Sequence, residues 1–243
     1  MQTRPLSDRS VLITGVTSGI GRALTTHLIG AGARVLGVGR DAERLSAVAE
    51  GWGERFTPVL ADLSSPEDRL RCIAAAREAG VDALVNNAGA CVYARPTAFS
   101  MDRWRALLEV NLLAAIELSS ALGADMGAGG QILNVSSVTA RHVAHPRFGP
   151  YAVTKAALEH FTESLRLELS PKGVAVSLLV PGLVDTPIYQ KVEGFERAEA
   201  RLREALPEWL TPQDVAESAA WMLSQPEHVV ISELVILPRG QAR

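Results

Sequence analysis

Short apolar runs alternate with longer mixed stretches along the whole chain. The runs at 10–14, 33–38, 57–61, 81–85, 132–135, 174–180 and 234–237 have the length and composition of buried strands. The stretches between them predict helices at 22–30, 41–50, 101–124, 151–169 and 211–224, and a further helix that begins at 64–66. Regular alternation of strand and helix predicts an α/β fold, a doubly wound parallel sheet with right-handed crossovers, made by one domain over residues 1–243.

Glycine-rich or polar turns follow five of the predicted strands. These turns begin at Gly15, Asp62, Asn86, Ser136 and Pro181. In a doubly wound sheet the carboxyl ends of the strands meet at one edge, and ligands bind there. We therefore expect the functional site at this edge.

The first turn, Gly15 to Gly21, joins a predicted strand to a predicted helix. Its glycines let phosphate oxygens approach backbone N–H groups, and the helix N-terminus adds a favourable dipole. The spacing Gly-x-x-x-Gly-x-Gly differs from the Gly-x-Gly-x-x-Gly dinucleotide fingerprint. Alone, it also fits a simple turn with close helix packing, but its place between strand and helix favours phosphate binding, with Thr17, Ser18 and Ile20 inside the turn.

The end of the second strand carries Gly39 and Arg40 where dinucleotide folds place a ribose-binding acid. A guanidinium suits a 2′-phosphate, so the position favours NADP(H) over NAD(H). Two alternatives stay open. Arg40 could be a solvated residue at a strand end, and Asp41 could bind the ribose if the register is shifted by one, although it fits a helix N-cap better.

The segment from Asn134 to Lys155 suggests proton-transfer chemistry. A strand ends in Ser136 and Ser137, and a helix then begins near Tyr151 and carries Lys155 one turn later. Residues four apart share a helix face, so the ammonium can approach the phenol and lower its pKa from about 10. A serine hydroxyl beside the phenol could hold a substrate oxygen, as transfer between an alcohol and a carbonyl requires. Tyrosine and lysine at this spacing also occur by chance on solvated helix faces.

Other polar positions have two interpretations each. Asp62 could accept from an adenine amino group or cap a helix, and the amides before Ala88 and Gly89 could border a flat ligand or form a plain turn. Asn111 interrupts the apolar face of the 101–124 helix, so it is either a satisfied core group or a site residue.

Bulk properties exclude several classes. The chain has 243 residues, 47% of them hydrophobic, and a net charge of −3, which implies no attraction to nucleic acid or membrane surfaces. No uninterrupted apolar run approaches the roughly 20 residues that span a bilayer, and the N-terminus lacks a signal-peptide core, so we expect a cytoplasmic protein. Cys72, Cys91 and the five histidines fit no metal spacing; we expect free thiols and no metal.

Residues 187–210 are charged, with apolar points at Ile188, Tyr189, Phe195 and Trp209. They could form a solvated helical pair, but their place directly after a strand favours a substrate lid. Arg141 or Arg147, in the loop before Tyr151, could pair with a substrate carboxylate or simply be solvated.

In this order the motifs resemble those of the short-chain dehydrogenase/reductase family along almost the whole chain. The matching segments are Thr14-Gly15-x-x-x-Gly19-x-Gly21, Asn86 to Gly89, Asn111, the serine pair, Tyr151-x-x-x-Lys155 and Pro181-Gly182-x-x-x-Thr186. The resemblance implies a Rossmann-type three-layer fold and an oxidoreductase that transfers hydride between NADP(H) and a small carbonyl or alcohol substrate. A catalytically silent NADP(H)-binding sensor or scaffold is the alternative, although it has no physical need for both Tyr151 and Lys155.

The resemblance also implies a role for each site residue. Tyr151 would be the general acid or base, Lys155 would bind the nicotinamide ribose and depress the tyrosine pKa, Ser137 would polarise the carbonyl, and Asn111 would hold a water. The implied cofactor contacts are Gly15, Thr17, Ser18, Gly19, Ile20, Gly21, Arg40, Asp62, Leu63, Asn87, Ala88, Gly89, Tyr151, Lys155, Pro181, Gly182, Val184 and Thr186.

Three departures from the family pattern matter. The segment from Ser137 to Tyr151 is one residue longer than usual, so Ser136 remains a rival for the serine role, and Ala140 stands where glycine is common. The chain ends in Leu234 to Gln241 instead of the glycine-rich ending of many members, and this part is similar to the NADP-dependent branch that acts on 3-hydroxy acids, hydroxy amino acids such as serine, or small aldehydes. The helices at 101–124 and 151–169 resemble those through which family members pair, which implies a homodimer or homotetramer.

Overall fold

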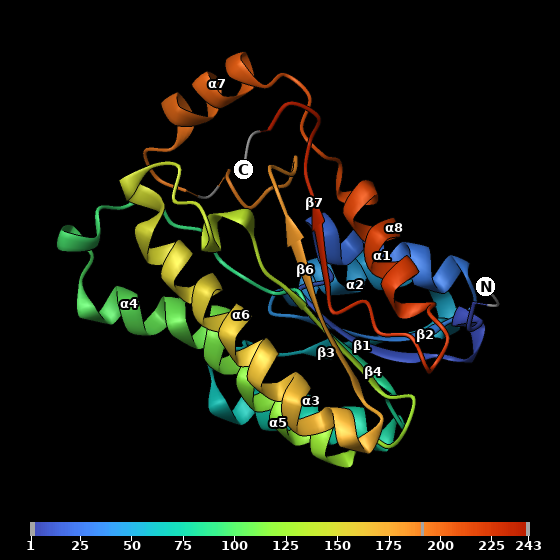
Figure 1. The fold of residues 1–243 in the computed structure, drawn as a ribbon. Helices are drawn as coiled ribbons and strands as arrows, with labels where there is room; N and C mark the ends of the chain where they lie inside the picture. Colours follow the sequence, from blue (N-terminus) through green and yellow to red (C-terminus); the bar gives the residue numbers. More distant parts are fainter. Residues whose placement is uncertain (1–2, 191, 242–243) are drawn as a thin grey trace.

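A seven-stranded, entirely parallel sheet forms the centre of the computed structural model, which describes residues 3–190 and 192–241 (Figure 1). The strand order is β3-β2-β1-β4-β5-β6-β7. The strands are β1 Ser10–Thr14, β2 Arg34–Gly39, β3 Phe56–Leu60, β4 Ala83–Asn86, β5 Gln131–Val135, β6 Ala175–Pro181 and β7 Glu233–Ile236. This confirms the predicted doubly wound sheet, whose order reverses between β1 and β4, where a crevice opens at the carboxyl ends.

Helices cover both faces of the sheet (Figure 1). One apolar cluster joins alternate strand residues to α1, α2 and α8, and the other joins the intervening strand residues to α3, α5 and α6. In β1, for example, Val11 and Ile13 belong to the first cluster and Leu12 to the second. The helices are α1 Gly19–Gly30, α2 Ala42–Glu50, α3 Pro66–Glu78, α4 Met101–Leu108, α5 Ala114–Asp125, α6 Gly149–Leu169, α7 Glu196–Ala205 and α8 Pro212–Leu223.

The helix predicted at 101–124 is continuous but irregular. A π-helical turn, Glu109–Leu113, separates α4 from α5 and holds the buried Asn111. By length and composition the stretch Met101–Asp125 could cross a membrane, because its most apolar window of 18 residues has a mean hydropathy of 1.5. The sequence contains no long uninterrupted apolar run here, because Asn111 and other polar residues interrupt the stretch. In this fold Leu118 is fully buried in a core cluster, as in the core helices of proteins that never enter a bilayer.

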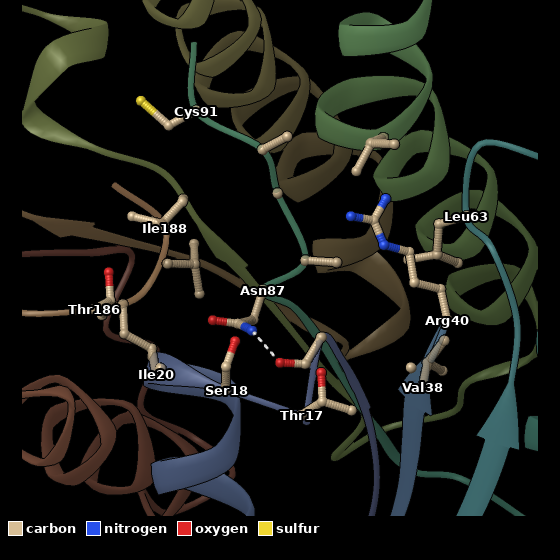
Figure 2. A pocket seen from close by; sticks show the side chains of 18 of the residues that line it. Thr17, Ser18, Ile20, Val38, Arg40, Leu63, Asn87, Cys91, Thr186 and Ile188 are labelled. Atoms are coloured by element: carbon tan, nitrogen blue, oxygen red, sulfur yellow. Dashed lines mark hydrogen bonds between the residues drawn. The ribbon is translucent and has the colours of Figure 1, made fainter. Parts of the chain in front are cut away.

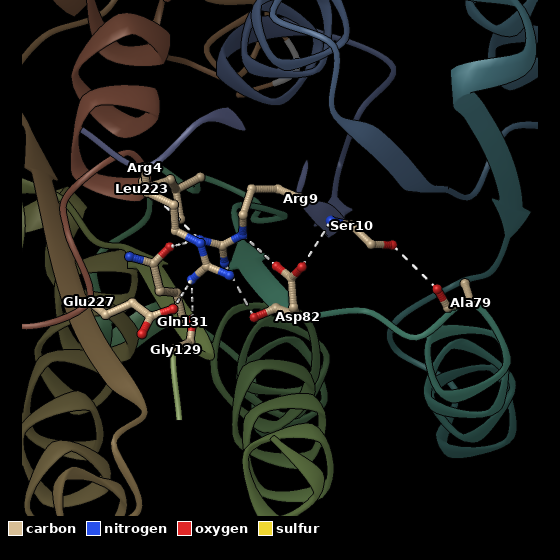
Figure 3. A network of polar contacts seen from close by, with 9 residues as sticks. All are labelled: Arg4, Arg9, Ser10, Ala79, Asp82, Gly129, Gln131, Leu223 and Glu227. Atoms are coloured by element: carbon tan, nitrogen blue, oxygen red, sulfur yellow. Dashed lines mark hydrogen bonds and ion pairs between the residues drawn. The ribbon is translucent and has the colours of Figure 1, made fainter. Parts of the chain in front are cut away.

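A buried polar network ties the strands together at the opposite edge of the sheet (Figure 3). Arg9, only 1% exposed, donates from Nε to Asp82 Oδ1 at 2.5 Å and from a terminal nitrogen to Gln131 Oε1 at 2.5 Å. The second oxygen of Asp82 accepts the backbone N–H of Ser10 at 3.2 Å. Through Asp82, which precedes β4, the network joins the amino ends of β1 and β5. It lies at the edge opposite the carboxyl ends of the strands, where the crevice opens.

Candidate active site

The glycine turn after β1 allows α1 to approach the sheet very closely. Gly15 and Gly19 have φ angles of +77° and +53°, in the left-handed region that favours glycine. A Cβ on Gly21 would lie 2.3 Å from the Gly15 carbonyl oxygen and 2.4 Å from Asn87 Nδ2. The N-cap residue, Ser18, makes no capping hydrogen bond through its side chain. The first N–H groups of α1 are therefore left available to an anion such as phosphate.

The end of β1 is joined to the end of β4 beside this turn. Thr14 Oγ1 accepts the N–H groups of Asn87 at 3.0 Å and Ala88 at 2.9 Å, and Asn87 Nδ2 donates to the Thr14 carbonyl at 2.8 Å. Asn86 points away into the core, where its Nδ2 donates to Ser119 and Asn134. The two adjacent amides thus differ: Asn87 borders the crevice, and Asn86 holds strands and helix together beneath it.

A cavity of about 420 Å³, here called the large cavity, runs along the carboxyl edge. Figure 2 shows Arg40 and Leu63 at one end and Cys91 and Ile188 at the other, with Asn87 between them. It is lined by the predicted cofactor residues Gly15, Thr17, Ser18, Gly19, Ile20, Arg40, Asp62, Leu63, Asn87, Ala88, Gly89, Tyr151, Lys155 and Thr186.

Arg40 and Asp41 both line one end of the large cavity, but their side chains have different partners. Asp41 is the N-cap of α2, and its Oδ1 accepts the Arg44 N–H at 3.0 Å, as its alternative interpretation predicted. Arg40 is exposed and makes no hydrogen bond or ion pair with the residues that the structure describes, so its guanidinium is available to a ligand.

Asp62 forms a local turn that lines the same end of the large cavity. Its carboxylate accepts the backbone N–H of Ser64 at 2.9 Å and the Ser64 hydroxyl at 2.8 Å, and these hydrogen bonds lower the pKa of Asp62. The N-cap of α3 is Ser65, not Asp62. Helix capping therefore does not account for Asp62, which lines the cavity beside the buried Leu63.

Three groups suited to proton transfer meet where β5 ends and α6 begins. Tyr151 and Ser137 both line the small cavity described below, and the Ser137 hydroxyl lowers the pKa of the phenol against the larger effect of burial. Lys155, 4% exposed, donates from Nζ to the carbonyl oxygen of Val135, the last residue of β5, at 2.8 Å. The helix spacing predicted from the sequence thus brings phenol, hydroxyl and ammonium to one wall of the crevice.

The predicted direction of the Tyr151 pKa is wrong for the protein on its own. Withdrawal from bulk water raises the pKa of Tyr151 well above 10, and the neighbouring Cys91 and Tyr189 raise it further. The same burial lowers the pKa of Lys155 to about 8, so the ammonium is itself destabilised. Desolvation therefore outweighs the attraction on which the prediction rested, and Tyr151 is a protonated donor at neutral pH.

The two serines after β5 have different partners. Ser136 is buried, and its hydroxyl donates to Glu159 Oε1 at 2.9 Å. Ser137 Oγ accepts the Thr139 N–H at 3.2 Å and donates to Thr139 Oγ1 at 3.2 Å. Both serines line the small cavity with Tyr151, but the Ser136 hydroxyl is committed to a carboxylate.

Asn111 lies behind the crevice wall. Its Oδ1 accepts the Ala90 N–H at 2.8 Å, and its Nδ2 donates to the Ala90 carbonyl at 2.9 Å and to Thr154 Oγ1 at 3.1 Å. Both amide hydrogens are used inside the protein, so the side chain has the satisfied arrangement of a core group. Its effect on the site is to fix the loop that follows Gly89 against α6.

The segment after β6 forms the wall of a smaller cavity. This small cavity, about 60 Å³, is bordered by Pro181, Gly182, Val184 and Thr186 together with Ser137, Tyr151 and Tyr189. Of the four residues predicted from this segment, only Thr186 also lines the large cavity. The other three border the small cavity alone.

The sequence did not reveal how residues 187–210 pack. Tyr189 stacks on Phe195 with ring centroids 5.1 Å apart, and Phe195 meets the edges of Tyr93 at 5.4 Å and Phe148 at 5.5 Å. The helix α7 follows at the upper left in Figure 1, beyond the carboxyl ends of the strands. Tyr93 and Phe148 were missed because nothing in their local sequence marks them as partners of a segment that lies about a hundred and about fifty residues further along the chain.

The two loop arginines are not equivalent. Arg141 donates two hydrogen bonds to Glu233, at 2.8 and 2.5 Å, and one to Glu159 at 2.9 Å. The prediction that it could bind a substrate carboxylate is therefore wrong. The Arg147 guanidinium lies 5.3 Å from the ring centroid of Tyr93, outside the set of residues that line either cavity.

Both cysteines are free thiols, as predicted. Burial raises the pKa of Cys72 to about 11 and that of Cys91, which lines both cavities, to about 12. Among residues 3–190 and 192–241 no group of three or more metal-binding side chains comes together.

Comparison with known proteins places this site in context. The model of the family described as short chain dehydrogenase matches residues 9–197. An uncharacterized oxidoreductase of Staphylococcus aureus is 32% identical over 96% of this chain and 98% of its own, and the serine 3-dehydrogenase of Agrobacterium fabrum is 31% identical over 96% and 95%. The closed form of a serine dehydrogenase complexed with NADP+ superposes with a TM-score of 0.87 at 27% identity, over 96% of both chains.

Proposed function

Because the chain belongs to the short chain dehydrogenase family, we propose that it is an NADP(H)-dependent oxidoreductase that interconverts a carbonyl compound and an alcohol. The observation that carries the proposal is the meeting of Ser137, Tyr151 and Lys155 on one wall of the large and small cavities. A catalytically silent binding protein would not need this arrangement.

The large cavity fits an NADP(H) molecule in shape and chemistry. The uncapped first turn of α1 suits a pyrophosphate, and Gly21 leaves no room for a side chain there. At the other end the unpaired guanidinium of Arg40 suits the 2′-phosphate, with Asp62 and Leu63 bordering the adenine. A relative with a TM-score of 0.87 was crystallised with NADP+, which supports the same choice. When bound, the nicotinamide supplies or accepts the hydride.

The side chains of the protein provide the rest of the chemistry. Ser137 and Tyr151 hold the substrate oxygen, and Tyr151 gives it a proton during reduction or takes one during oxidation. Lys155 adds positive charge close to the phenol, which favours the phenolate once a proton has left. Asn111, whose amide hydrogens are both engaged, positions the wall around Ala90, and only its Oδ1, which accepts one N–H, has a lone pair left for a water in the proton path.

Catalysis by Tyr151 is tested by replacing it with phenylalanine. NADPH oxidation is followed across a panel of ketones and aldehydes for wild type, Tyr151→Phe and Tyr93→Phe, a matched variant outside both cavities. Loss of the shared proton donor should lower kcat about 10²–10⁴-fold in Tyr151→Phe alone. Full turnover by Tyr151→Phe would contradict the mechanism. Tight NADPH binding without turnover of any substrate would favour the silent alternative.

The cofactor preference is tested separately by Arg40→Ala. Loss of a charge-assisted contact of about 1.5–3 kcal/mol should weaken NADPH binding roughly tenfold to a hundredfold and leave NADH binding nearly unchanged. Arg22→Ala, in the solvent-exposed part of α1, is the control for a general loss of positive charge. Equal weakening of both cofactors would contradict the assignment to NADP(H).

We further propose a cytoplasmic homodimer or homotetramer that pairs through α4, α5 and α6. Exposed apolar side chains on these helices support the proposal, among them Met101, Leu113, Val153 and Leu167. Light scattering of the purified protein measures the assembly size, and a monomer at micromolar concentration would contradict it.

A further inference from the structure

The small cavity holds a polar group that the proposed mechanism does not use. Tyr189 borders this cavity together with Tyr151 and Ser137, and its ring stacks on Phe195 at 5.1 Å with the edge of Trp209 at 5.7 Å. Phe195 and Trp209, which belong to the same segment 187–210, thus hold the Tyr189 ring in place. In the part of the chain that the structure describes, the Tyr189 hydroxyl makes no hydrogen bond to another residue.

The position of that hydroxyl matters because the cavity is narrow. A volume of about 60 Å³ has room for roughly five water-sized groups, which matches a substrate of four to six heavy atoms. With the reacting oxygen held by Ser137 and Tyr151, the rest of so small a molecule must lie within reach of Tyr189. Tyr189 is half-buried at the cavity wall, so its hydroxyl, which has no partner among the described residues, can form a hydrogen bond with a second polar group of a substrate.

The walls of the small cavity also indicate the charge of that group. None of its described lining residues is charged: they are hydroxyl, thiol and apolar side chains, including Ile188 and Val184. Arg141, the arginine that could have reached toward a carboxylate from the preceding loop, is held by Glu159 and Glu233. Burial raises the pKa values of Tyr151 and Tyr189, which shows that this environment disfavours anions.

We infer that Tyr189 is a specificity-determining residue that binds a neutral hydroxyl on the carbon next to the reacting one, so that the preferred substrates are small vicinal diols and the matching hydroxyketones. The inference rests on the proposed function. In the oxidation of a diol the Tyr151 phenol first releases its own proton to solvent; the carbinol C–H bond then breaks, its hydride goes to NADP+, and the O–H proton goes to the Tyr151 phenolate as the C=O bond forms. Tyr189 keeps its proton throughout and exchanges only a hydrogen bond with the second hydroxyl.

Three compounds of nearly equal size test the inference. Sec-butanol, propylene glycol and lactate share the same methyl carbinol. The second substituent on the carbinol carbon is an ethyl group in sec-butanol, a hydroxymethyl group in propylene glycol and a carboxylate in lactate. The kcat/KM of each is measured with NADP+ for wild type, Tyr189→Phe and the control Tyr93→Phe, which belongs to the same aromatic cluster but lines neither cavity. Phenylalanine keeps the ring packing, and thermal unfolding of each variant verifies the fold.

We expect wild type and Tyr93→Phe to prefer propylene glycol to both other compounds by at least about tenfold, because a site built to bind a hydroxyl rejects an analogue without it. In Tyr189→Phe the preference over sec-butanol should fall to within about threefold, with sec-butanol turnover unchanged. A wild-type preference for lactate or sec-butanol would overturn the inference, as would an unchanged preference in Tyr189→Phe. If wild type oxidises none of the three but reduces larger ketones in a Tyr151-dependent manner, this inference fails and the proposed function stands.

Discussion

The ammonium nitrogen of Lys155 lies 2.8 Å from the carbonyl oxygen of Val135, so a charged side chain on α6 is bonded to the last residue of β5. Only 4% of Lys155 is exposed, and the bond joins the helix that carries Tyr151 to the strand that leads to Ser137. The geometry of the catalytic wall therefore depends on a cation that burial destabilises.

This bond predicts a pH dependence of stability. The pKa of Lys155 is about 8 in the folded protein and 10.5 when unperturbed, so between these values the unfolded chain binds more protons and the free energy of unfolding rises with pH. Relative to Lys155→Met, wild type should gain up to about 3 kcal/mol from pH 7.5 to 10.5, at 1.36 kcal/mol per pKa unit. Urea unfolding across this range measures the difference. The free energy of unfolding of Lys172→Met, which replaces an exposed lysine, should change with pH as that of wild type does. If that of Lys155→Met also changes as in wild type, the depressed pKa of Lys155 is contradicted.

The serine pair predicts two different phenotypes. Ser137→Ala removes the hydroxyl that reaches Tyr151 and should lower kcat about a hundredfold with little change in the free energy of unfolding. Ser136→Ala removes the partner of Glu159 and should lower the free energy of unfolding by about 1–2 kcal/mol, with at most a modest effect on kcat. Steady-state kinetics and urea unfolding of both variants check this, and the reverse pattern would return the catalytic role to Ser136.

The close approach of α1 to β1 predicts the effect of adding one methyl group. In Gly21→Ala the new Cβ would lie 2.3 Å from a backbone oxygen and 2.4 Å from Asn87 Nδ2, so the turn must shift. We expect NADPH binding to weaken by at least tenfold and the protein to lose about 1–3 kcal/mol of stability. Gly30→Ala, in the same helix with no atom within 4 Å of the new Cβ, should preserve both. Fluorescence titration with NADPH compares the two variants.

The Arg9 network at the opposite edge predicts a loss of stability without a loss of chemistry. Arg9→Met leaves Asp82 and Gln131 without their shared donor, which should lower the free energy of unfolding by about 2–4 kcal/mol. The exposed pair Arg105 and Asp102 provides the control, since Arg105→Met should change stability by less than about 1 kcal/mol. At 25 °C the kcat of folded Arg9→Met should equal that of wild type. A large drop in kcat would mean that the two edges of the sheet are coupled.

The fold could be predicted because its elements follow from local patterns. Strand β1 occupies the predicted residues, and the other strands differ from their predicted bounds by one or two residues. The capping role of Asp41 was also predictable from its place before a helical stretch. Strand length, helix caps and glycine turns are all recorded in neighbouring residues, so a single sequence is enough to read them.

The parts that the sequence could not predict depend on distances between segments far apart in the chain. Arg141 had an ordinary loop context, and only the fold brings Glu233 to it. The direction of the Tyr151 pKa depended on how far burial outweighs a nearby charge, which spacing along a helix does not reveal. Asn111 was visible as an interruption of an apolar face, but its π-helical turn and its bonds to Ala90 were not.

The aromatic cluster has a kinetic consequence. Tyr189 borders the small cavity and is stacked on Phe195, which in turn lies against Tyr93 and Phe148, so opening this side of the small cavity requires these rings to separate. Separation of packed rings on a segment held by the ion pair of Arg203 with Asp185 is far slower than proton transfer. If the product leaves on this side, we expect its release to limit turnover, and turnover should then slow as solvent viscosity rises.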